Sequence, residues 1–128
     1  MSNTTRFLPL LLGSLLLGGC ATSTVTNLTP SQLPRKANGQ YLFEVEWTSR
    51  QKSLVRESIK PYVVIGLSQH PMRQTPMLTN RWETLVPIPG NQDLTPYRYK
   101  FDYNYLGFGM HKSDSKMSKP YQLRIADQ

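Results

Sequence analysis

The sequence predicts an all-β domain of about six or seven short strands. Three observations lead to this prediction. Apolar and polar residues alternate along several segments, turn-forming residues separate those segments, and no segment of useful length carries an apolar stripe with helical spacing. Short strands at this spacing favour an immunoglobulin-like β-sandwich, and a small β-barrel is the alternative.

The chain begins with a segment that has the features of a secretory signal peptide. Arg6 is followed by an apolar run over residues 7–17, and small residues come next. A helix needs about 20 apolar residues to cross a bilayer, so this run is too short for a permanent span. We therefore expect residues 1–19 to be removed during export.

The end of this leader, Leu17-Gly18-Gly19-Cys20, resembles the lipobox of bacterial lipoproteins. The resemblance implies diacylglycerol on the Cys20 sulfur, cleavage before Cys20 and acylation of the new amino group. Cys20 is the only cysteine in the chain, so it has no partner for an internal disulfide. Two or three acyl chains anchor a protein firmly, because each buried methylene contributes about 0.8 kcal/mol. Ala21 and Thr22 follow, and the resemblance then implies sorting to the outer membrane.

Residues 20–38 are expected to form a lipidated, flexible tether. The segment is rich in Thr, Ser, Pro and Asn, and its apolar residues show no periodicity. The β-sandwich is then expected to occupy residues 39–128, which is the length of one domain.

The exported chain is basic. Of the 15 Lys and Arg and 8 Asp and Glu residues, only Arg6 lies in the leader, so 14 basic and 8 acidic residues give a formal charge of +6. Such a balance can attract nucleic acid, anionic lipid or acidic glycans. Export argues against nucleic acid, which leaves the membrane, another envelope protein or an anionic glycan as partners.

The first half of the domain contains two predicted strands of different kinds. Apolar residues occupy every second position of the first strand: Tyr41, Phe43, Val45 and Trp47. This pattern is typical of a strand with one face in water. Residues 49–60 are charged and ambiguous, although a second strand could start among them. The continuous apolar run at 61–67 predicts a strand that is covered on both faces.

The second half contains the strongest strand signal. Residues 72–75 are expected to form a short edge piece, and 80–87 a strand that Pro87 ends. One face of the strongest strand is aromatic: Tyr97, Tyr99, Phe101, Tyr103 and Tyr105. Its other face is polar: Arg98, Lys100, Asp102 and Asn104. Residues 106–120 are expected to form a loop, and 121–125 the last strand.

No recognisable catalytic or metal-binding motif is present. His70 and His111 fall in predicted turn and loop segments, and no serine lies in a nucleophile elbow. With Cys20 acylated, the histidines and scattered acids lack the spacing of metal ligands. We therefore expect a protein that is not an enzyme and that carries no metal or cofactor.

A second resemblance concerns residues 81–102. Arg81-Trp82-Glu83, the Pro-Gly turn at 87–90 and the Tyr-Lys-Phe strand resemble the glycogen- and starch-binding early-set immunoglobulin-like modules. About 25 residues are covered, with Trp82 and Lys100 at comparable positions. The chain departs from that family after Asp102, where its Asp-Gly pair and second tryptophan are missing, so the resemblance supports the fold better than sugar binding.

These observations define one candidate site and its competing interpretation. If the domain binds a glycan, we expect four residues to bind it: Trp82, Arg98, Lys100 and Asn104. An aromatic ring stacks on a sugar, while cationic and amide groups bond its hydroxyls. The favoured alternative places Trp82 in the core and leaves the polar face as solvated sheet.

Three function classes follow from the sequence. The leading hypothesis is an outer-membrane lipoprotein that serves as a non-catalytic binding or assembly module for another envelope protein. The second is a lipoprotein that binds a polysaccharide, such as peptidoglycan or lipopolysaccharide. The third is an enzyme, for which the sequence supplies no motif.

Overall fold

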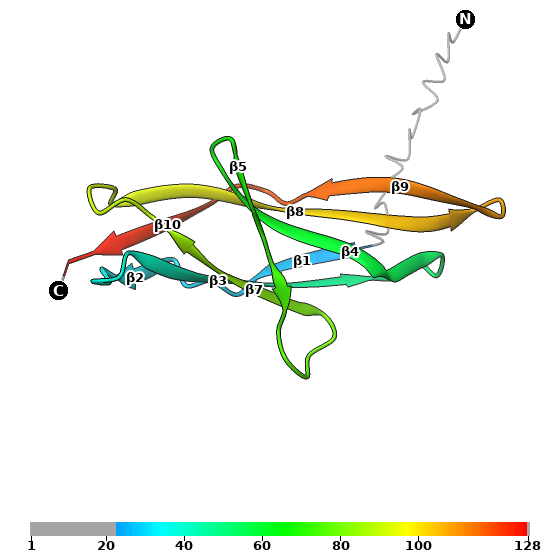
Figure 1. The fold of residues 1–128 in the computed structure, drawn as a ribbon, viewed down its shortest axis with the longest axis horizontal. Helices are drawn as coiled ribbons and strands as arrows, with labels where there is room; N and C mark the ends of the chain where they lie inside the picture. Colours follow the sequence, from blue (N-terminus) through cyan, green and yellow to red (C-terminus); the bar gives the residue numbers. More distant parts are fainter. Residues whose placement is uncertain (1–22, 128) are drawn as a thin grey trace, which may run out of the picture.

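Alternating apolar side chains fold this chain into two facing β-sheets (Figure 1). The structure, a computed structural model, describes residues 23–127, and the predicted signal peptide and Cys20 lie outside this range. Within the range all helical and strand structure is strand, which confirms the all-β class.

The first sheet has four strands. In spatial order they are β1 (Ser23–Asn27), β3 (Gln40–Ser49), β7 (Arg81–Pro87) and β6 (Arg73–Gln74). All of its pairings are antiparallel.

The second sheet is built around one long strand. In spatial order its strands are β2 (Gln32–Pro34), β10 (Tyr121–Ala126), β8 (Leu94–Gly107), β4 (Leu54–Ile65) and β5 (Ser68–Pro71). On its edge opposite β4, β8 pairs first with β10 and then with β9 (Met110–Met117).

This strand order confirms the immunoglobulin-like β-sandwich rather than the small barrel. The strands β1-β3-β7-β6 reproduce the order A-B-E-D of that fold, and β10-β8-β4 reproduce G-F-C. Strand A is divided, because β1 belongs to the first sheet while β2 pairs in parallel with β10 in the second. Strand G is likewise divided, into β9 and β10. These two divisions and the additional edge strand β5 explain why more segments form than the six or seven expected.

The core lies between the inner faces of β3 and β8, as their alternation predicts. Both strands bury every second residue, and the buried side chains are mostly aromatic. Trp47 stacks on Phe101 with 4.8 Å between ring centroids, and Phe43 meets Tyr97 edge-on at 4.9 Å. Such pairs contribute about 0.5–1.5 kcal/mol each beyond the area they bury.

The prediction of a tether over residues 20–38 is wrong from Ser23 onward. Residues 23–27 pair with β3, and residues 32–34 pair with β10, so the domain begins well before Gly39. The segment lacks apolar periodicity because its strands are short and lie at sheet edges, and because the chain changes sheet between them.

Polar side chains fix this change of sheet. The Tyr99 hydroxyl lies 2.7 Å from Asn27 Oδ1, 2.8 Å from Thr29 Oγ1 and 3.0 Å from the Glu44 carbonyl oxygen. Asn27 Nδ2 donates to the Tyr97 hydroxyl at 2.8 Å. Burial raises the pKa of Tyr99 well above its ordinary value, so this hydroxyl stays protonated at neutral pH. The network therefore ties the first strand to both sheets.

The predicted loop at 106–120 is also wrong in part. Residues 110–117 form β9, which pairs with β8 from Lys100 to Gly107. Between its terminal methionines β9 is polar on both faces, because the hairpin extends past the end of the other sheet and its far half has no core to cover. In the ambiguous segment 49–60, a strand begins at Leu54, with an irregularity in its pairing between Val55 and Lys60.

None of the residues that the structure describes forms a helix long and apolar enough to span a membrane.

We predict that Tyr99→Phe lowers the free energy of unfolding by about 1–3 kcal/mol, because it leaves buried polar partners unsatisfied. Urea denaturation of this variant and the parent measures the difference. Tyr105→Phe is the matched control, since that ring is only half-buried at the edge of the core. Equal midpoints for the two variants would contradict the assigned role of the network.

Candidate functional site

The outer face of the second sheet gathers the polar side chains of three adjacent strands. Because side chains alternate along a strand, residues that face water on β4, β8 and β9 lie side by side according to register. Asp102 is paired with Lys60 on one side and with Ser115 on the other. Asn104 is likewise paired with Ser113, and Lys100 with Tyr62.

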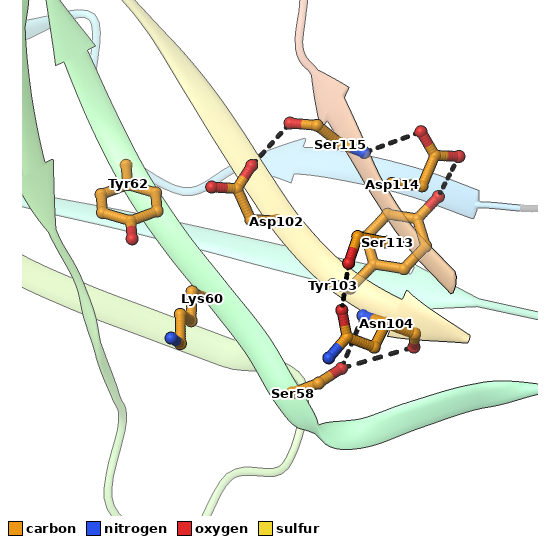
Figure 2. A pocket seen from close by; sticks show the side chains of 9 residues that line it. All are labelled: Ser58, Lys60, Tyr62, Asp102, Tyr103, Asn104, Ser113, Asp114 and Ser115. Atoms are coloured by element: carbon orange, nitrogen blue, oxygen red, sulfur yellow. Dashed lines mark hydrogen bonds between the residues drawn. The ribbon is translucent and has the colours of Figure 1, made fainter. Parts of the chain in front are cut away.

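These residues line a groove of about 550 Å³ (Figure 2). Strand β4 contributes Ser58, Lys60 and Tyr62, β8 contributes Asp102 and Asn104, and β9 contributes Ser113 and Ser115. Tyr103 and Asp114 also border it. We call this surface the outer-face groove.

Hydrogen bonds hold the acceptors of the groove in place. Ser115 Oγ donates to Asp102 Oδ1 at 2.6 Å, and Lys100 Nζ lies 3.6 Å from the same oxygen. Ser113 Oγ donates to Asn104 Oδ1 at 2.9 Å. These bonds orient the Asn104 amide so that its Nδ2 group remains available as a donor.

Two donors in the groove lack a protein partner. Within residues 23–127, neither the Lys60 ammonium nor Asn104 Nδ2 bonds another protein group. Figure 2 shows both side chains at the groove, and no dashed line reaches either nitrogen. Nearby, Lys100 Nζ lies 6.0 Å from the centroid of the half-buried Tyr62 ring. The groove therefore offers hydrogen-bond donors beside an aromatic ring.

At the β9 side of the groove, the Tyr103 hydroxyl donates to Asp114 Oδ2 at 3.1 Å. Burial of the ring, followed by this bond and the charge of Asp114, raises the pKa of Tyr103 to about 12. Tyr103 is therefore a neutral donor at physiological pH, and its bond fixes the carboxylate of Asp114.

The structure brings together only part of the site predicted from the sequence. Lys100 and Asn104 share the outer face at the groove, while Arg98 borders a separate hollow beside Val64. Trp82 belongs to the opposite sheet, where it is only 7% exposed and contacts Phe101 edge-on at 6.1 Å. Its inclusion with the other three is therefore wrong, because the core separates it from the outer face.

Sequence reasoning missed the residues that neighbouring strands contribute. Lys60 directly precedes the continuous apolar run at 61–67 and Tyr62 lies within it, while Ser113 and Ser115 lie in a segment expected to be a loop. The signal that could have found the serines is the glycine-containing segment Gly107-Phe108-Gly109 directly after the strongest strand, which is typical of a hairpin turn.

The histidines do not form a catalytic pair. His70 pairs with Val63 on β4, and His111 pairs with Leu106 on β8. Val63 itself pairs with Tyr99, so seven residues of β8, or about 23 Å, separate the two positions. Among residues 23–127, no three His, Cys, Asp or Glu side chains are grouped so that they could hold a metal ion.

Comparison with known proteins identifies no family for this chain. No family model matches the sequence, and no curated protein matches it. A solved structure of murine CRIg is similar with 11% sequence identity and a TM-score of 0.42, over 80% of this chain and 98% of that one.

We predict that Trp82→Ala lowers the free energy of unfolding by about 3–5 kcal/mol, because it removes a buried ring from the core. Urea denaturation measures the loss. Leu85→Ala is the control, since Leu85 lies on the same strand with its side chain largely in water. Wild-type stability of Trp82→Ala would contradict the core assignment.

Proposed function

We propose that this chain is a non-catalytic, lipid-anchored binding module of the bacterial envelope, and that its outer-face groove binds another envelope protein. One observation carries the proposal. The groove presents the Lys60 ammonium and Asn104 Nδ2 as donors without a partner among residues 23–127, beside serine hydroxyls and carboxylates that are held in place. Fixed polar groups of both kinds suit the backbone and side chains of a polypeptide segment.

The charges in the groove favour a protein over an anionic glycan. Lys60 is the one cation among the residues that line the groove, and Asp102 and Asp114 line it as well, so the groove has no excess of positive charge. An anionic glycan would place its acidic groups near these two carboxylates, and like charges placed side by side oppose binding.

A polysaccharide is the second candidate, and Tyr62 favours it. The half-buried ring lies at the groove beside amide and hydroxyl groups. This combination suits a neutral sugar, whose apolar face stacks on an aromatic ring while its hydroxyls form hydrogen bonds.

Anchoring at Cys20 is tested separately. In a bacterial host that lipidates proteins, we expect Cys20→Ser to abolish acylation and to leave unprocessed precursor or a released soluble form. Mass spectrometry of the parent should find residues 1–19 removed and Cys20 carrying acyl chains. An unmodified Cys20 thiol in the membrane fraction would contradict the lipoprotein assignment, and fractionation of the envelope tests the outer membrane.

Partner binding is tested by photo-crosslinking in cells. A photoreactive residue in place of Ser113 is expected to give a specific protein adduct, because that position borders the groove. The same residue in place of Leu85, on the outer face of the opposite sheet, is the matched control. Lys60→Glu should remove the Ser113 adduct by reversing the charge of an unpartnered donor. An adduct that proteases leave intact would favour the polysaccharide, and equal adducts at both positions would exclude the groove.

A further inference from the structure

The tip of the β8–β9 hairpin exposes a cluster of apolar side chains. Phe108 is 100% exposed, Met110 67% and Leu106 49%. All three lie within five consecutive residues, so their apolar surface is contiguous along the chain. Exposed large apolar groups gathered at a protruding turn are typical of a surface that contacts another phase or molecule.

The backbone conformation at the tip is unfavourable for Phe108. Gly107 and Met110 form the last pair of the hairpin, and both residues between them have positive φ, 52° at Phe108 and 74° at Gly109. A turn with both central φ angles positive prefers Asn or Gly at its first central position. A bulky aromatic residue there is an outlier that points to a function outside the fold.

Contacts within the domain do not explain Phe108. Its ring is fully exposed, and its neighbour is the ammonium of Lys112, 5.2 Å from the ring centroid. The strained conformation therefore stabilises nothing in the core, and its effect is to present the ring to the surroundings.

The tip lies at the end of the molecule where the described chain begins. Lys116 Nζ donates to Ser23 Oγ at 3.0 Å, which places the start of β1 beside β9. From Lys116 the hairpin continues for six residues to Met110, or about 20 Å. Figure 1 shows its tip at the opposite end of the long axis from the C-terminus.

The proposed anchor is close to this surface. Ser23 follows Cys20 by three positions in the chain, and three residues of chain span at most about 10 Å. Because β1 starts at Ser23, no long tether separates an acylated Cys20 from the domain. A bilayer that holds the acyl chains is therefore within reach of β9 and its tip.

Basic side chains accompany the apolar tip. Lys112 lies beside Phe108, and the turn between β3 and β4 places exposed Arg50 and Lys52 at the same end of the sandwich. The acid on this part of β9, Asp114, is bonded to Tyr103. An apolar tip flanked by cations fits a membrane surface that contains anionic lipids.

We propose that the β8–β9 hairpin tip is a second membrane contact, with Phe108 inserted among the lipid headgroups and Lys112, Arg50 and Lys52 near their phosphates. The proposal rests on the proposed anchor for its orientation. Anchor and tip together would lay β9 along the bilayer and hold the domain in one orientation, which a single flexible attachment would not do.

The test measures lipid binding without the anchor. The chain from residue 20 with Cys20→Ser retains every strand of the sandwich. It is mixed with vesicles of phosphatidylcholine, with or without phosphatidylglycerol, and bound protein is measured by flotation. We expect binding to the vesicles that contain phosphatidylglycerol, and a loss of about tenfold or more in Phe108→Asn, because the buried ring is removed.

A matched control separates insertion from general effects of the substitution. Met77 is equally exposed and also has a positive φ of 65°, but it lies between β6 and β7. Met77→Asn should leave binding unchanged, and both variants should melt no lower than the parent, since Asn accepts positive φ. Absence of binding by the parent, or the same binding in both variants, would overturn the proposal. Because the assay contains no acylated protein, this result is independent of whether mass spectrometry finds Cys20 acylated.

Discussion

The alternation of side chains along β8 is the constraint on which the rest of the structure depends. This strand has 14 residues and pairs with β4, β9 and β10. Its inward positions supply the largest part of the aromatic core, and its outward positions supply Asp102 and Asn104 to the groove. A shift of one residue in its register would bury the polar set and expose the rings, so burial of the rings also fixes the polar face.

The division of the first strand between two sheets depends on buried polar groups as well as on the packing of Val25 and Leu33 against the core. Asn27 and Thr29 bond the hydroxyls of Tyr97 and Tyr99, which project from the core face of β8. Further along, the Arg35 guanidinium bonds Asp93, Asp127 and the carbonyl oxygen of Gly90. The hydrogen bond to Asp127 is the main cause of a raised pKa at Arg35. A guanidinium is cationic at physiological pH in any case, so Arg35 keeps its charge in these contacts. These two sets of contacts hold β2 against β10 although only three residue pairs join them.

The groove and the hairpin tip are separate consequences of the length of the β8–β9 hairpin. Its first half lies over the sandwich, where β4 gives the polar face a third row of side chains. Its far half extends past the opposite sheet, so neither of its faces is covered by the core. One hairpin can therefore contribute both to a binding surface and to a membrane contact, because the two lie on different parts of it.

The sequence by itself determined the all-β class, the two strongest strands and the division of β8 into an apolar and a polar face. Period-two alternation is a local property, so Tyr41 to Trp47 and Tyr97 to Tyr105 could be assigned without any partner. Tertiary structure alone decided that residues 23–34 belong to the sandwich, since their strands pair with β3 and β10 and the side chains of Asn27 and Thr29 bond tyrosines about 70 residues away in β8. It also decided that Trp82 faces the core and that Lys60, Ser113 and Asn104 meet at one groove. The physical reason is that strand pairing and register determine which residues are neighbours across a sheet. They link residues distant in sequence, so they cannot be predicted from local periodicity.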